Sequence, residues 1–83
     1  MQPRKRRRLR IPDDEPQKRL GANVRRLRLA HELTQEELAG ACDLHPTEIG
    51  RIERGERDLR LSTVVRVARG LDVAPETLFS GLR

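Results

Sequence analysis

The chain has 83 residues, enough for one small domain, and its 18 lysine and arginine residues outnumber its 13 acidic residues to give a net charge of +5. One cysteine and two separated histidines exclude a disulfide framework and predict no metal site, and no apolar run approaches the roughly 18 residues of a membrane-spanning helix. With no tryptophan or tyrosine and a single phenylalanine, the chain also lacks the aromatic side chains that stack on RNA or single strands.

The first 16 residues divide into a basic block and an acidic, proline-containing linker. Residues 1–12 hold six basic and no acidic residues, and residues 13–16 hold three acidic ones, which leaves a net charge of +2 on residues 17–83. The six basic residues are Arg4, Lys5, Arg6, Arg7, Arg8 and Arg10. Because like charges repel and nothing here can nucleate a packed element, we expect residues 1–16 to be a disordered arm and residues 17–83 to be the folded domain.

Helical periodicity begins at Gln17. Leu20, Val24 and Leu27 recur at the spacing of one helical face and predict a first helix over residues 17–31. Charged residues flank this apolar face, as expected for a helix that covers a small core.

Residues 34–43 carry the signals of a second helix. Thr34 and Glu37 have the spacing of a capping box, in which each side chain accepts a hydrogen bond from the other residue's backbone N–H. Asp43 is expected to end the helix, because aspartate tolerates the left-handed backbone conformation better than most residues do. The inner face is formed by Leu38, Ala39 and Cys42.

A third helix is expected between Pro46 and Gly55, because proline is favoured at the first helical position and glycine just past the end. Ile49 and Ile52 supply its buried side, and His45 is expected to cap its first turn.

Two further helices complete the predicted fold. The apolar spacing over residues 61–70 predicts a fourth helix, and Pro75 opens a short fifth one. The inner face of the fourth helix consists of Leu61, Val64, Ala68 and Leu71. Since no segment alternates with a period of two, we expect an all-α, compact five-helix domain with connections of two to six residues.

Three parts of the sequence, TQEELA at residues 34–39, Leu44 with Ile49, and RIERG at residues 51–55, together resemble the phage-repressor-type helix-turn-helix family (Xre, Cro/repressor-like). The similarity covers residues 17–82. It implies that residues 35–54 form a helix-turn-helix whose second helix enters the major groove of double-stranded DNA. The sequence departs from the family at three positions. Glu32 and Asp43 stand where glycine is usual, and Leu59 stands where proline is often found.

The resemblance places candidate base contacts on the outer face of the third helix, at Pro46, Thr47, Glu48 and Arg51. Arg51 lies mid-helix, and arginine pairs with guanine through two hydrogen bonds; a phosphate contact or a solvated side chain is the alternative. For Thr47 the alternative is a helix-start residue without a DNA contact. Glu48 suits the amino group of cytosine, but we favour a role in capping the helix N-terminus and complementing its dipole.

Other candidates are expected to contact the DNA backbone. The resemblance implies a phosphate contact for Gln35 at the start of the second helix, and Arg54, Arg57 and Arg60 surround the turn after the third helix. The basic arm is expected to add phosphate contacts, because the domain itself carries a charge of only +2. A nuclear localisation signal and a solubilising tail are the alternatives for the arm.

The remaining assignments concern the scaffold and the assembly. The resemblance implies a salt bridge between Arg28 and Glu53 that joins the first and third helices. Apolar residues near the C-terminus are expected to form a homodimer interface, namely Val65, Leu78, Phe79 and Leu82. The alternative for Phe79 is that it closes the core of the monomer.

We therefore expect a non-enzymatic, sequence-specific transcriptional regulator of the prokaryotic cytoplasm that is associated with the nucleoid and not with a membrane. As a homodimer it would bind a two-fold symmetric operator, without a cofactor, as a repressor or a small autoregulatory controller. Contact with RNA polymerase is a second route of regulation. The alternatives are an antitoxin-like or adaptor protein that binds a partner protein, and a nonspecific nucleoid protein.

Overall fold

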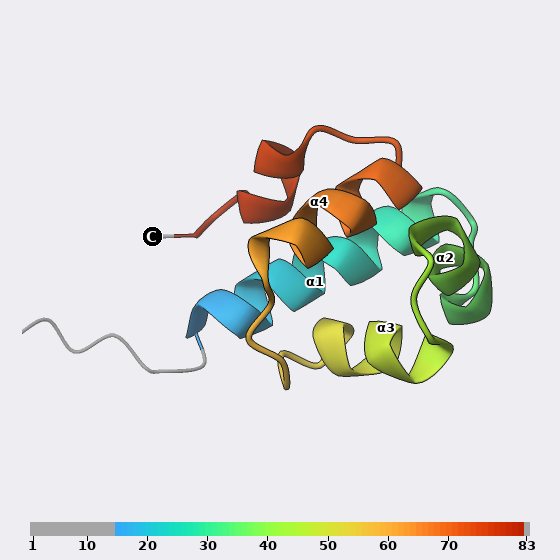
Figure 1. The fold of residues 1–83 in the computed structure, drawn as a ribbon. Helices are drawn as coiled ribbons and strands as arrows, with labels where there is room; N and C mark the ends of the chain where they lie inside the picture. The colour runs from blue at the N-terminus through green and yellow to red at the C-terminus, as the bar shows by residue number, and fades with distance from the viewer. Residues whose placement is uncertain (1–14, 83) are drawn as a thin grey trace, which may run out of the picture.

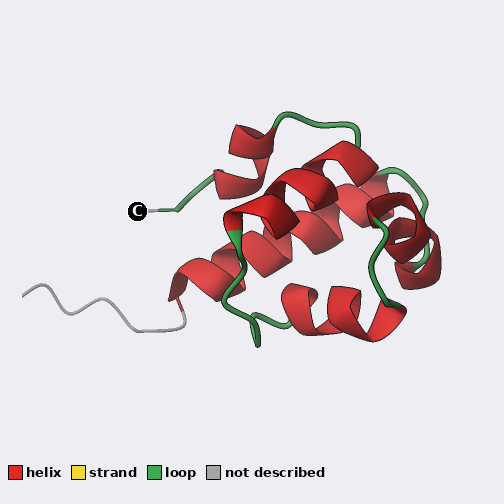
Figure 2. Ribbon diagram, viewed as in Figure 1, coloured by secondary structure: helices red, strands yellow, loops and turns green. Residues whose placement is uncertain are grey.

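The computed structural model describes residues 15–82. These residues form α1 (Glu15–Ala30), α2 (Gln35–Cys42), α3 (Pro46–Glu53), α4 (Leu61–Gly70) and the 3₁₀-helix η1 (Pro75–Phe79), and none of them belongs to a strand (Figure 2). The predicted arm of residues 1–16 lies outside the described residues except for its last two, which belong to the first turn of α1. The helices α2 and α3 fall within the segment 35–54 that was expected to form the helix-turn-helix.

The longest helix, α1, lies between the helix-turn-helix segment and the C-terminal helix η1. It packs against α3 on one side and η1 on the other, while α2 packs against α3 and α4 (Figure 1). The helix α4 also contacts η1, so the C-terminal segment closes the domain against both α1 and α4. None of the helices in the described part of the chain is long and apolar enough to cross a membrane.

The predicted apolar faces meet in one core. The largest side chains that are fully buried there are Leu38, Ile49, Ile52, Leu71, Leu78, Val24 and Val67. The prediction was wrong for Leu61, whose side chain is 73% exposed. Leu61 is the first residue of α4, and the buried stripe of this helix begins one turn later, at Val64.

The predicted helix ends are confirmed by hydrogen bonds and backbone angles. Thr34 Oγ1 accepts from the backbone N–H of Glu37 at 3.0 Å, and Glu37 Oε1 accepts from the backbone N–H of Thr34 at 2.8 Å. Asp43 ends α2 in the left-handed conformation with φ of 59°. His45 caps α3, since its Nδ1 accepts from the backbone N–H of Thr47 at 3.1 Å.

The segment expected as a fifth α-helix is the 3₁₀-helix η1, which is only five residues long. A segment this short, begun by a proline, forms few α-helical hydrogen bonds, and 3₁₀ turns are common in such short pieces. Asn23, a buried residue of α1, holds η1 in place, because its Nδ2 donates to the carbonyl oxygens of Leu78 and Ser80, both at 2.8 Å. This role of Asn23 was not predicted from the sequence.

Cys42 behaves as a small core residue, as its neighbours on the predicted inner face of α2 do. Burial raises the pKa of its thiol, and the nearby charge of Arg66 opposes this shift. The Arg66 side chain donates to the backbone carbonyl oxygens of Cys42 and Asp43, so that it satisfies the C-terminal end of α2 from α4.

Candidate nucleic-acid interface

The angle between α2 and α3 is fixed by buried side chains of both helices. Leu38 and Ala39 of α2 and Ile49 and Ile52 of α3 are each at most 1% exposed. Between them, the backbone N–H of Leu44 donates to the carbonyl oxygen of Ala39 at 2.9 Å and closes the turn. The outer face of α3 is thereby held at the surface of the domain.

A buried ion pair joins α3 to α1, as the resemblance implied. Arg28 Nε and Nη2 donate to the two carboxylate oxygens of Glu53 at 2.6 and 3.1 Å, and the two side chains are only 10% and 3% exposed. Arg28 Nη1 also donates to the carbonyl oxygen of Leu33 at 2.8 Å. Gln35 Nε2 donates to Glu53 Oε1 at 3.1 Å. One carboxylate thus connects α1, α3 and the first residue of α2.

The candidate base contacts lie along one side of α3. Thr47, Arg51 and Arg54 are exposed, and Pro46 and Glu48 are partly exposed. A cleft of about 520 Å³ separates the start of α2 from the start of α3, and its lining includes Gln35 and Thr47. Within residues 15–82 the Arg51 guanidinium forms no side-chain hydrogen bond or ion pair, although its positive charge helps to lower the pKa of the Glu56 carboxyl.

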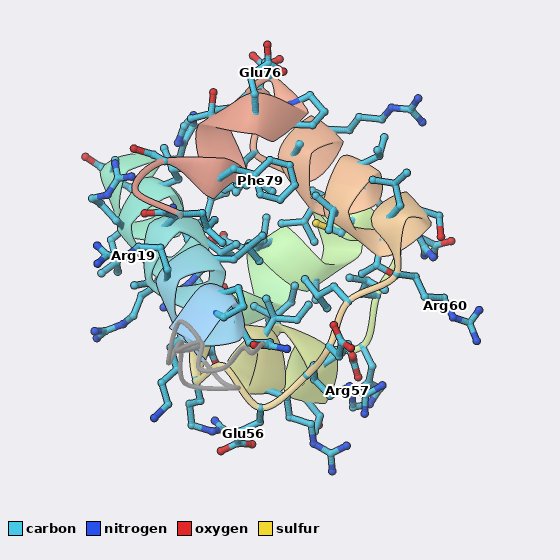
Figure 3. All side chains as sticks on the ribbon, turned by 90° about the vertical axis from the view of Figure 1, so that its left-hand side faces the viewer. Arg19, Glu56, Arg57, Arg60, Glu76 and Phe79 are labelled. Carbon is cyan, nitrogen blue, oxygen red and sulfur yellow. The ribbon has the colours of Figure 1, made fainter. Side chains whose placement is uncertain are left out.

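Two of the arginines expected at phosphates pair with acidic residues in the free protein. Arg57 Nε lies 3.1 Å from Glu48 Oε2. Arg54 Nε donates to Glu56 Oε2 at 2.9 Å, and this hydrogen bond lowers the pKa of the Glu56 carboxyl. Figure 3 shows Arg57 and Glu56 beside α3, and Arg60 extending outward at the start of α4.

The expectation that Glu48 caps α3 does not hold. The cap is provided by His45, whose imidazole accepts from the first turn, and the carboxylate of Glu48 turns to Arg57. Glu48 remains the acidic residue in the first turn of α3, where it suits the helix dipole. The pairing of Glu48 with Arg57 was not predicted from the sequence, because the two residues are nine positions apart and only the turn after α3 brings them together.

The residues expected at a dimer interface separate into two groups. Leu78 is fully buried in the core of the monomer, so its side chain does not reach the surface. Phe79 is 41% exposed, and Val65 and Leu82 are partly exposed. Figure 3 shows the side chain of Phe79, the last residue of η1, on the face turned toward the viewer. It borders an apolar cleft of about 180 Å³ whose lining includes Leu20, Leu59 and Leu82.

The basic residues of the predicted arm, from Arg4 to Arg10, lie outside the described residues, and their contacts stay a prediction. Within the described part of the chain no group of acidic, cysteine and histidine residues could hold a metal ion.

Comparison with known proteins gives one family match and several similar controllers. The model of the helix-turn-helix family HTH_3 matches residues 24–78. Control protein C.BamHI of Bacillus amyloliquefaciens is 42% identical over 59 residues, which are 70% of this chain and 73% of that protein. Control protein C.SmaI of Serratia marcescens is 41% identical over 61 residues, 74% of this chain and 73% of that protein.

Among solved structures, the restriction-modification controller protein C.AhdI from Aeromonas hydrophila superposes with a TM-score of 0.73 at 37% identity. The match covers 75% of this chain and 94% of that one. The agreement therefore includes both the helix-turn-helix and the helices that support it.

Proposed function

The chain belongs to the helix-turn-helix family together with these control proteins, and from this membership we propose that it is a sequence-specific transcriptional controller that binds the major groove of double-stranded DNA with α3. The observation that carries the proposal is the geometry of α3. Its inner face is locked to α2 by buried side chains, and its outer face presents Thr47 and the unpaired Arg51. A groove about 12 Å wide admits one such helix.

Selection of bound sites from random duplex DNA tests this function. We expect enrichment of a short sequence repeated with two-fold symmetry, with half-sites one helical turn apart. A bound pool without an enriched sequence would indicate a nonspecific nucleoid protein. Failure to bind any duplex, with copurification of a second protein from the host, would favour the adaptor alternative.

Arg51→Ala is expected to weaken binding to the selected site by about 1–3 kcal/mol and to relax the preference at one base pair in each half-site. The reason is that Arg51 is exposed in the last turn of α3 and forms no ion pair within the described residues, so its guanidinium can pair with guanine. Affinities of wild type and variant for the selected site and for its single-base variants measure the effect. Arg69→Ala, an exposed position on α4, is the control and should change little. An equal loss on selected and random DNA would make Arg51 a phosphate contact.

We further propose a homodimer that forms through the surface around Val65, Phe79 and Leu82, with the buried Leu78 packed beneath it. Phe79→Asp is expected to weaken dimerisation by about 2 kcal/mol or more, because a charge would replace the largest apolar side chain at the interface. Sedimentation equilibrium measures the change. Leu29→Asp is the control, because it places the same charge at another exposed apolar side chain, on α1. A wild type that stays monomeric at high concentration and binds one copy per site would exclude the dimer.

The basic arm is proposed to contact phosphates. Deletion of residues 1–12 lowers the net charge from +5 to −1. Each lost phosphate contact reduces the slope of log K against log salt by about 0.9, so the largest change is about 5 units, and we expect roughly half of it. Base preference and melting temperature should persist, because α3 and the core are untouched. An unchanged salt slope would leave the arm a solubilising tail.

Whether the protein represses or activates transcription depends on where its operator lies relative to the promoter. A controller of this size that covers a promoter acts as a repressor, and one that binds beside it can contact RNA polymerase. Binding to chromosomal DNA would place the protein in the bacterial nucleoid. Mapping bound sites on the host genome distinguishes these cases and shows whether the protein binds its own promoter.

A further inference from the structure

We propose that Glu48 is a positioning residue for DNA specificity, which fixes the guanidinium of Arg57 beside the first turn of α3. This inference rests on the proposed function. The observation behind it is the ion pair between Glu48 Oε2 and Arg57 Nε, at 3.1 Å. It links the helix expected to enter the groove to the irregular segment of residues 54–60 that follows it.

The pair is more sheltered than the other ion pair on this face. The side chains of Glu48 and Arg57 are 24% and 44% exposed, whereas those of Glu56 and Arg54 are 53% and 58% exposed. Exposed pairs are screened by salt and hold their side chains weakly, while partly buried pairs are screened much less. Salt therefore screens the pair of Glu48 and Arg57 less. Two hydrogen bonds join Arg54 to Glu56, but these residues lie two positions apart in one segment, whereas Glu48 ties Arg57 to α3.

The surroundings of the pair favour a role at DNA. Glu48 and Arg57 line a polar cleft of about 230 Å³ together with Asp58 and with Arg60 and Thr63 from the start of α4. No acidic residue lies in the first turn of α4, and no side chain caps that helix. An anionic backbone next to this cleft would therefore meet Arg57 in a fixed position and the uncapped N–H groups of α4 beside it.

The pair gives selectivity through the orientation of Arg57. An arginine held in one orientation keeps its remaining N–H donors aimed at one place, so it loses less conformational entropy when the correct site is bound. On DNA that does not fit, the held guanidinium is not aimed at an acceptor, so it contributes less to binding. Glu48 is thus expected to raise the ratio of operator affinity to random-DNA affinity.

The experiment compares Glu48→Gln with Glu56→Gln, each in the wild type and in an Arg57→Ala background. Both substitutions remove one negative charge from the same face, so both should change the salt slope alike. The measured quantity is the ratio of the affinity for the selected operator to the affinity for a random duplex of equal length. Thermal melting of each variant checks that it is folded.

In the wild-type background, Glu48→Gln is expected to lower this ratio by about threefold to tenfold, and Glu56→Gln by much less. In the Arg57→Ala background, Glu48→Gln should strengthen binding to both DNAs and leave the ratio unchanged, because only an unpaired carboxylate is removed.

Four results would overturn the inference. Equal effects of Glu48→Gln and Glu56→Gln would show that charge alone matters. A fall in the ratio that persists without Arg57 would show that Glu48 contacts a base directly. A wild type that binds operator and random DNA equally would remove the proposed function as well, whereas a selective wild type with an unaffected Glu48→Gln variant would remove only this inference.

Discussion

Gly21→Ala is expected to destabilise the domain by about 3 kcal/mol or more, because the added methyl group would meet the backbone of α3. A Cβ atom at this position would lie 2.2 Å from the carbonyl oxygen of Ile52 and 2.8 Å from that of Glu53. Both obstacles are backbone atoms, which no rotamer change can move aside. The helices α1 and α3 would have to separate, and overpacking of this kind typically costs 1–3 kcal/mol even where side chains can yield. Urea unfolding followed by circular dichroism measures the change.

Gly40→Ala is the matched control for this prediction. Gly40 lies within α2, and no atom approaches the position that its Cβ would occupy within 4 Å. Alanine is favoured over glycine in a helix by roughly 0.8–1 kcal/mol, so this variant should be more stable than the wild type. A Gly21→Ala variant as stable as the wild type would show that α1 and α3 do not approach each other as closely as described.

Glu53→Ala is expected to destabilise the domain by about 3–5 kcal/mol, because it leaves the buried guanidinium of Arg28 without its partner. The carboxylate accepts two hydrogen bonds from Arg28 and one from Gln35, and all three donors would lose their acceptor. Since the free energy of unfolding of a domain of this size is only about 5 kcal/mol, the variant should be largely unfolded at growth temperature. The midpoint of urea unfolding is the measurement.

The double variant Arg28→Met/Glu53→Leu shows how much of this loss comes from leaving Arg28 unpaired and how much from losing the ion pair as a whole. Replacing both charges by apolar side chains of similar size is often neutral, so the double variant should be clearly more stable than Glu53→Ala. It should still be less stable than the wild type, because the carbonyl oxygen of Leu33 loses its donor. A Glu53→Ala variant that matches the double variant would indicate that Arg28 reaches water when unpaired.

Local chemistry explains which features could be predicted from the sequence. The capping box of Thr34 and Glu37 and the turn at Asp43 depend on residues a few positions apart, and the structure has each of them. Apolar spacing located the buried faces, apart from Leu61 at the exposed start of α4. The family pattern added the pair of Arg28 and Glu53, which spacing alone does not indicate.

Contacts between distant segments were beyond the reach of the sequence. Asn23 holds carbonyl groups 55 and 57 positions away, and a polar residue on a helix gives no sign of such partners. The pairing of Glu48 with Arg57 depends on the path of an irregular segment, which periodicity does not describe. The close approach of α1 to α3 at Gly21 could not be predicted either, because a glycine within a helix indicates only a lower helix propensity. Such contacts decide how the α3 face is presented, although they leave no local pattern.

The two hydrogen bonds of Asn23 also have a mechanical consequence. They fasten the backbone on either side of Phe79 to α1, and α1 packs directly against α3. In a dimer joined at Phe79, α1 would therefore connect the dimer interface rigidly to α3 in each subunit, and the distance between the two α3 helices would be fixed. Such a dimer cannot adjust to a half-site that is displaced along the DNA axis. The DNA would have to bend or twist to fit an operator with altered spacing. Its stiffness, given by a persistence length of about 150 base pairs, would therefore decide how much change in spacing the operator tolerates.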